Sequence, residues 1–218
     1  MKYKKLTGIV LKKQNYREAD QIVTIWTQEA GKVRVMARGL RLGKSKLSFS
    51  MQDLSLVDFE TAGNKSLPAL ISAKSLKNFT YLRQDLPKMV AAFYAIELIL
   101  KMTPDEQPNE EAYELLLEFF EYLNHAEISD QPLHTFVDCF SLRLLRSLGF
   151  SIEHAQSIIN LPGRLNDTLN SLMESHYADL HKLQLSEVVA DQSHVIVKNF
   201  IEFILERNIK SEQFLVSI

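Results

Sequence analysis

The first eighty residues alternate hydrophobic and polar positions over short distances, which is typical of half-buried strands. In the segment 32–38, one face carries Val33, Val35 and Ala37, and the other carries Lys32, Arg34, Met36 and Arg38. Four more segments have strand-like composition, 5–13, 21–27, 53–60 and 67–76, and turn-forming residues separate them. Gly8, inside the first segment, indicates a bend or bulge. Five short strands in so short a segment predict a small Greek-key barrel such as the OB-fold.

Beyond residue 80 the spacing of apolar residues becomes helical. Asp85 and Pro87 resemble the start of a helix, as does Asn109, and Gly149 is a natural stop. We expect helices at 88–102, 110–123, 133–150 and 191–207, with two or three short helices between 150 and 190. The predicted fold is therefore α+β, with an OB-fold barrel in residues 1–80 followed by an all-helical domain in residues 81–218.

Charge is divided unevenly between these two parts. The formal net charge is −2, but residues 1–80 carry fifteen Lys and Arg against six Asp and Glu, a balance of +9. The remaining residues carry ten basic and twenty-one acidic side chains, a balance of −11. Such a split predicts two modules with different partners, the basic one suited to nucleic acid or an anionic membrane surface. A basic face that is only solvated is the alternative.

The segment "GKVRVMARGLRLGKSKL", residues 31–47, concentrates the positive charge and contains no acidic residue. Arg34 and Arg38 share the outer face of the predicted third strand, and Gly39 and Gly43 let the backbone approach a phosphate closely. A basic groove of this kind follows a phosphate backbone. We predict that the DNA-contacting side chains are Lys12, Lys13, Arg17, Arg34, Arg38, Arg41, Lys44 and Lys46.

Four aromatic side chains of the basic module are candidates for stacking on bases: Tyr3, Tyr16, Trp26 and Phe49. Trp26 lies in an apolar strand, and we therefore favour a core position for it.

No pattern of residues favours an enzyme, a cofactor or a metal site. The six histidines are scattered, and we interpret them as surface or cap residues because a metal needs several converging ligands. Cys139, the single cysteine, falls inside a predicted helix as a small hydrophobic residue. No apolar run reaches eighteen residues and no signal peptide is evident, so we expect a cytoplasmic protein without membrane spans.

Four segments in the same order resemble the bacterial RecO family of recombination mediators: residues 7–47, 82–98, 140–150 and 198–215. The resemblance implies an N-terminal OB-fold, a helical domain, binding of single- and double-stranded DNA, and annealing of complementary strands. It also implies partnership with RecR, contact with the C-terminal tail of single-strand-binding protein, and indirect help in loading RecA.

Many members of that family carry four zinc-binding cysteines after a segment similar to "LGF", and this chain has none there. We expect residues 150–190 to replace the zinc-bearing lobe without metal. Arg143 and Arg146 are the candidate contacts for an acidic partner peptide, and ordinary solvated arginines are the alternative. The rival to a DNA-binding mediator is a protein-interaction adaptor whose basic face is only solvated.

Overall fold

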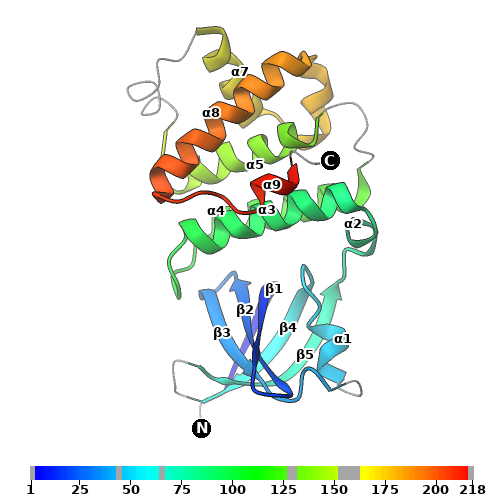
Figure 1. Cartoon of the computed structure of the whole chain (residues 1–218). Coiled ribbons are helices and arrows are strands. Elements are labelled where there is room, and N and C mark those ends of the chain that lie inside the picture. The colour runs from blue at the N-terminus through cyan, green and yellow to red at the C-terminus, as the bar shows by residue number, and fades with distance from the viewer. Residues whose placement is uncertain (1–2, 43–45, 64–66, 127–131, 152–162, 216–218) are drawn as a thin grey trace. The chain divides into compact units, whose positions relative to one another are not determined.

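The computed structural model describes residues 3–42, 46–63, 67–126, 132–151 and 163–215. The chain divides into two compact units (Figure 1). The barrel unit comprises Met1–Phe79 and Pro104–Tyr113, and the helical unit comprises Thr80–Thr103 and Glu114–Ile218.

Five strands close into a barrel in the order β1-β2-β3-β5-β4. Their bounds are β1 Tyr3–Tyr16, β2 Asp20–Thr27, β3 Gly31–Ala37, β4 Leu56–Ala62 and β5 Ala69–Lys77, and a short helix, α1 Lys46–Ser50, lies between β3 and β4. All pairs are antiparallel except β3 with β5. This confirms the α+β fold with an N-terminal five-stranded barrel.

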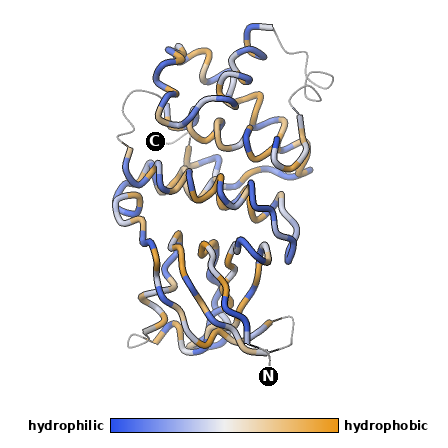
Figure 2. The backbone as a smooth tube through the Cα atoms, turned by 180° about the vertical axis from the view of Figure 1, so that it is seen from behind, coloured by the Kyte–Doolittle hydropathy of each residue, from blue (hydrophilic) through white to orange (hydrophobic). Residues whose placement is uncertain are grey.

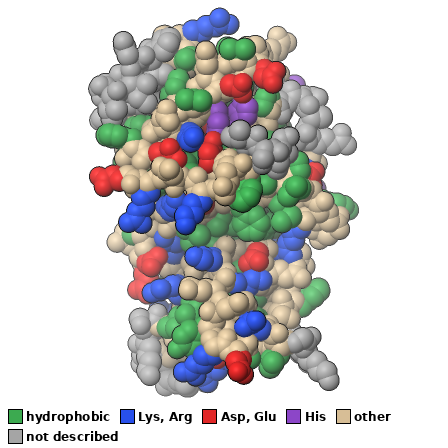
Figure 3. Space-filling model, in the orientation of Figure 1, with side chains coloured by type: hydrophobic (Ala, Val, Ile, Leu, Met, Phe, Trp, Pro, Cys, Tyr) green, Lys and Arg blue, Asp and Glu red, His purple; other side chains and the backbone are tan. Residues whose placement is uncertain are grey.

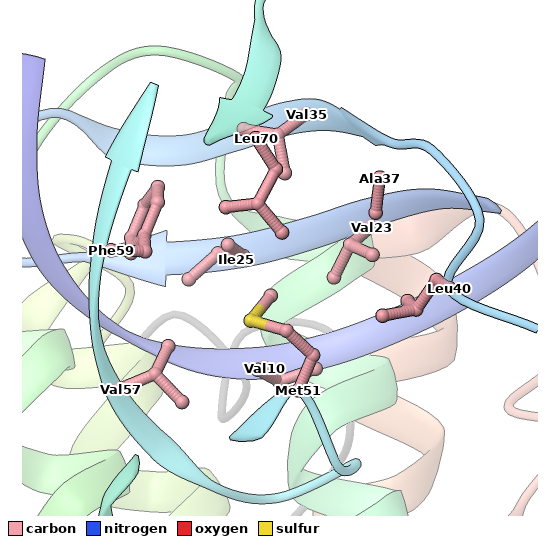
Figure 4. Close-up of a cluster of buried hydrophobic side chains, with 10 residues drawn as sticks. All are labelled: Val10, Val23, Ile25, Val35, Ala37, Leu40, Met51, Val57, Phe59 and Leu70. Carbon is pink, nitrogen blue, oxygen red and sulfur yellow. The ribbon is translucent and has the colours of Figure 1, made fainter. Parts of the chain in front are cut away.

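The alternation predicted for β3 sets the two faces of the barrel wall. Val35 and Ala37 are buried, and Arg34 is exposed. β3 is in register with β2, so that Val23 lies opposite Val35. Figure 4 shows the buried side chains converging from all five strands and from the segment between β3 and β4: Val10, Val23, Ile25, Val35, Ala37, Leu40, Met51, Val57, Phe59 and Leu70. Because Val35 and Ala37 commit one face of β3 to this core, Arg34 lies on the opposite face.

The bulge in β1 is not at Gly8, where the sequence indicated a bend or bulge. The register shifts between Val10 and Lys12 instead. Gly8 lies where two strands approach closely, since a Cβ atom there would sit 2.6 Å from the carbonyl oxygen of Trp26. The position therefore requires glycine, which has no side chain to clash with the neighbouring strand.

A segment from beyond the strands completes the barrel unit. Lys32 is buried and pairs with Asp105, their Nζ and Oδ1 atoms lying 3.4 Å apart. The carbonyl of Lys32 also accepts a hydrogen bond from the Glu106 N–H at 3.0 Å. Burial lowers the pKa of Lys32, and Asp105 opposes that shift. Lys32 was expected on the outer face with Arg34, and instead it anchors residues 104–113 to the β2–β3 turn.

The remaining helices lie in the helical unit, except that residues 110–113 at the start of α4 belong to the barrel unit. Their bounds are α2 Thr80–Gln84, α3 Leu86–Met102, α4 Glu110–His125, α5 Leu133–Ser147, α7 Gly163–Glu174, the 3-10 helix η1 Tyr177–Leu183, α8 Glu187–Leu205 and α9 Glu212–Leu215. The predicted caps are present: Asp85 accepts from the Lys88 N–H at 3.1 Å, and Asn109 accepts from the Ala112 N–H at 2.9 Å. In the described part of the chain no helix is long and apolar enough to cross a membrane.

Aromatic rings fill the space between α4, α5 and η1. Phe119 stacks on Phe140 with ring centroids 5.0 Å apart, and Tyr177 lies 5.2 Å from Phe119. Such pairs add to the stabilisation from buried apolar area. Figure 2 shows hydrophobic and hydrophilic positions alternating along the helices, as expected when each helix buries one face.

A buried ion cluster joins three helices of this unit. The His194 ring from α8 lies between Asp138 of α5, with Nδ1 to Oδ1 at 2.8 Å, and Glu212 of α9, with Nε2 to Oε1 at 2.9 Å. Burial alone would lower the pKa of His194, but the two carboxylates outweigh it and raise that pKa to about 10. The interpretation of all six histidines as surface or cap residues was therefore wrong for His194.

The carboxylate of Glu97 holds the segment that leads into α9. Glu97 of α3 accepts hydrogen bonds from the backbone N–H groups of Lys210 and Ser211, at 2.9 and 2.7 Å, and pairs with Lys101. Burial alone would raise the pKa of Glu97, but the hydrogen bonds from Lys101, Ser211 and Lys210 lower it to about 2. Together with His194, this carboxylate fixes the C-terminal helix to α3 and α8.

We expect the His194→Gln substitution to cost about 3–5 kcal/mol at neutral pH, because it leaves two buried carboxylates without a cation. The pKa of His194 is raised from about 6.5 when unfolded to about 10 when folded. The stabilisation is thus complete below about pH 6.5 and is lost as the pH rises to 10. Chemical denaturation at pH 6, 8 and 10 measures this. His181→Gln, at an exposed histidine, is the control. If the stability of His194→Gln changed with pH as much as that of the wild type, the assignment would be contradicted.

Candidate nucleic-acid interface

Two predicted DNA contacts lie in one row across the first three strands. Lys12 of β1 pairs with Thr24 of β2, and Thr24 pairs in turn with Arg34 of β3. Lys12 and Arg34 are both exposed, and neighbouring strands lie about 4.8 Å apart. The β1 bulge after Val10 shifts the register of β1 against β2, and Lys12 therefore lies in the same row as Arg34.

Three more arginines gather at the end of the β1–β2 hairpin. We call this region, residues 16–20 and 38–42, the hairpin rim. The Gly39 N–H donates to Asp20 Oδ1 at 2.8 Å. Arg41 donates from its backbone N–H to the Ala19 carbonyl at 3.1 Å and from Nη1 to the Glu18 carbonyl at 2.9 Å. These bonds hold the segment after β3 against the hairpin turn, and they bring together the exposed side chains of Arg17, Arg38 and Arg41.

The other predicted contacts do not join this group. Lys13 is half-buried and pairs with Asp53, with 3.3 Å between Nζ and Oδ2. Lys44 lies outside the described residues, and Lys46 begins α1. Five of the eight residues predicted from the sequence are therefore exposed, two in the row across the strands and three at the hairpin rim.

Several of the gathered cations lack an acidic partner. Among the residues that the structure describes, no carboxylate pairs with Lys12, Arg34 or Arg38. Glu18 is the exposed acid of the rim, and the Asp20 carboxylate is engaged by Gly39. Figure 3 shows Lys and Arg side chains spread over the barrel unit on the face it draws. Unpaired surface cations retain their attraction for phosphate.

The two arginines predicted to bind a partner peptide are paired within the helical unit. Arg143 Nη2 lies 3.1 Å from Glu118 Oε2, and its guanidinium lies over the Tyr177 ring at 5.2 Å. Arg146 pairs with Glu174, and 46% of its side chain is exposed. Arg143 is thus mainly a packing residue, and Arg146 is the more accessible of the two.

Comparison with known proteins supports one family over most of the chain. The family model described as "Recombination protein O N terminal" matches residues 1–79, and "Recombination protein O C terminal" matches residues 83–160. The chain belongs to the RecO family.

Curated relatives carry the name DNA repair protein RecO. The one from Symbiobacterium thermophilum is 35% identical over 143 residues, which is 66% of this chain and 55% of the relative. One from Listeria monocytogenes is 34% identical, with the same shares covered. The chain thus spans just over half the length of these two relatives. One from Acetivibrio thermocellus is 24% identical, covering 100% of this chain and 98% of the relative.

The buried cluster of this RecO chain does not have the features of a catalytic site. A general base needs a free lone pair, and both ring nitrogens of His194 are already bound to carboxylates. With a pKa of about 10, the imidazole is protonated at neutral pH. Among the described residues, no group of His, Cys, Asp and Glu is arranged to hold a metal ion. Cys139 is buried, and burial raises its pKa to about 12, so its thiol is not activated.

One signal in the sequence pointed to the position of His194. Ala190, Val197 and Ile201 are buried on α8, and His194 lies between them at helical spacing. A histidine at a position where the pattern requires an apolar side chain indicates a buried, partnered ring. The partners themselves come from other helices, 18 and 56 residues away in the sequence, and local spacing does not reveal them.

Proposed function

We propose that this protein is a recombination mediator in DNA repair that performs no bond chemistry and needs no cofactor. In this proposal the barrel binds single- and double-stranded DNA, and the protein anneals complementary strands. It acts with RecR, contacts the C-terminal tail of single-strand-binding protein, and so helps indirectly to load RecA. Membership of the RecO family supports the proposal.

The observation that carries the proposal is the arrangement of exposed cations on the barrel. The row of Lys12 and Arg34 runs across the outer strand surface, and the hairpin rim adds Arg17, Arg38 and Arg41. Such cations bind phosphates with release of counterions, which supplies affinity without reading the sequence. Neutralising the backbone lowers the repulsion between two strands while the bases remain free to pair.

The helical unit is the proposed partner-binding part. Residues 80–103 and 114–218, which form this unit, carry ten basic and seventeen acidic side chains, a balance of −7 that repels phosphates. Arg146 offers a partly exposed cation at the C-terminal end of α5. An acidic peptide approaching it would compete with Glu174, and a cation near a helix C-terminus is itself stabilised by the helix dipole.

A protein-interaction adaptor is the alternative function. Ile71 and Leu76 of β5 are large apolar side chains left exposed on the barrel, and exposed apolar area is typical of protein interfaces. In that case the basic face would be only solvated, and oligonucleotide binding would be weak and without a systematic salt dependence.

We expect the Arg34→Ala/Arg38→Ala variant to weaken the salt dependence of binding to single-stranded DNA. Four to five phosphate contacts give a slope of log K against log salt of about −3, and removing two contacts makes it less steep by about 1.4. Titrations of a fluorescent oligonucleotide at several salt concentrations measure the slope.

The matched control replaces two exposed lysines of β5, Lys74 and Lys77, by alanine. Both double variants should keep the wild-type stability within about 0.5 kcal/mol, because the positions are exposed. An unchanged slope in the arginine variant would favour the adaptor function. An equal loss in both variants would show that total charge matters and that the arginines are not a specific site.

For the partner site, we expect Arg146→Glu to weaken binding of an acidic-aromatic tail peptide about 5-fold, since an exposed ion pair contributes up to about 1 kcal/mol. Arg146 is preferable to Arg143, whose replacement would also disturb packing on Tyr177. Arg164→Glu changes the same charge at an exposed position of α7 and should leave affinity unchanged. Fluorescence anisotropy of a labelled peptide measures both, and equal affinities would remove Arg146 from the site.

A further inference from the structure

The hairpin rim differs chemically from the rest of the basic surface. At the row of Lys12 and Arg34, the neighbouring outward residue is Thr24, which offers nothing to stack on a base. At the rim, Tyr16 is 40% exposed and Leu42 is 58% exposed. Exposed apolar and aromatic side chains next to arginines are the combination that single-stranded nucleic acid requires, because its bases and its phosphates must both be contacted.

The local structure holds the Tyr16 ring in place. Tyr16 ends β1 opposite Asp20, and Asp20 is fixed by its hydrogen bond from Gly39. The Arg17 guanidinium lies over the Tyr16 ring, 5.3 Å from its centroid. Arg17 has a φ of +59°, a left-handed conformation that is unfavourable for a residue with a side chain and is over-represented at functional sites. The ring thus has one face against a cation and part of its surface open to solvent.

Leu42 is presented by a tight turn. Its N–H donates to the Gly39 carbonyl at 3.1 Å, and Gly39 has a φ of +64°. The same segment is held to the hairpin by Arg41, which donates to the carbonyls of Glu18 and Ala19. An exposed leucine is therefore kept at the rim by hydrogen bonds and not by burial.

We propose that the hairpin rim binds unpaired bases, with Tyr16 as the stacking residue and Leu42 as its apolar neighbour. Arg17, Arg38 and Arg41 hold the adjacent phosphates. The cations of the row and the rim serve single strands and duplexes alike, whereas Tyr16 and Leu42 contribute only where bases are unstacked. The inference rests on the proposed DNA-binding function and specifies its ligand as DNA that contains a single-stranded segment.

The test compares three probes at one salt concentration: a single-stranded oligonucleotide, a duplex of the same length, and an abasic strand with the same backbone. We expect Tyr16→Ala to lower affinity for the base-bearing strand about 10-fold, within the range found when one stacked base loses its aromatic partner. Affinity for the duplex and the abasic strand should stay within 2-fold, and the salt slope should not change, because no charge is removed.

Three further variants separate stacking from structural damage. Tyr16→Phe should retain wild-type binding, and Tyr16→Leu, which stays apolar but has no ring, should behave as Tyr16→Ala does. Tyr81→Ala is the control, since Tyr81 is a 65% exposed tyrosine of α2 in the helical unit. Circular dichroism and thermal unfolding confirm that each variant is folded.

The possible failures are distinguishable. If Tyr16→Ala binds the base-bearing strand as the wild type does, the rim does not stack on bases, although the DNA-binding function stands. If it loses affinity for the abasic strand equally, Tyr16 only positions Arg17 and the proposal is overturned. If the wild-type protein binds none of the three probes, the proposed function itself is contradicted.

Discussion

The position of the basic side chains depends on a few hydrogen bonds at the end of the β1–β2 hairpin. Asp20 accepts from the Gly39 N–H, and Arg41 donates to the carbonyls of Ala19 and Glu18. Because the left-handed conformation of Gly39 turns the chain there, the residues after β3 return to the hairpin. Without this contact, Arg38 and Arg41 would lie on a free loop, and their charges would not add to those of the strands.

Cations of this protein fall into two classes according to their partners. Lys32, Lys13 and Arg143 are at least half-buried and paired with carboxylates, so their charges stabilise the fold. Lys12 and Arg34 have no such partner among the described residues and lie on the outer strand surface. The distinction explains how a slightly acidic RecO chain presents a positive face, since the net charge says nothing about which charges are already neutralised.

The sequence predicted the features that depend on local pattern. Alternation on β3 identified Val35 and Ala37 as core and Arg34 and Arg38 as exposed, and the caps at Asp85 and Asn109 followed from residue type. The pattern on β3 is informative because one face of the strand packs into the barrel core. A shift of the strand by one residue would turn its charged side chains into that core. Trp26 is fully buried, as its apolar strand indicated.

Features that depend on residues far apart in the sequence were not predicted. Lys32 looked equivalent to Arg34 because its partner, Asp105, lies 73 residues further along the chain. His194 looked isolated for the same reason, since its carboxylates come from α5 and α9. The pairing of Lys13 with Asp53 was likewise not predicted, because Asp53 lies forty residues further along the chain and alternation does not reveal it.

Hydrogen–deuterium exchange of the intact protein, with and without a single-stranded oligonucleotide at low salt, tests the central claim most directly. We expect slower exchange in peptides covering residues 12–24 and 34–42, because bound DNA shields those backbone amides and rigidifies the rim. Peptides from α5 should exchange at the same rate in both samples. Protection confined to the helical unit, with residues 34–42 unchanged while DNA is bound, would contradict the assignment of the barrel as the DNA-binding surface.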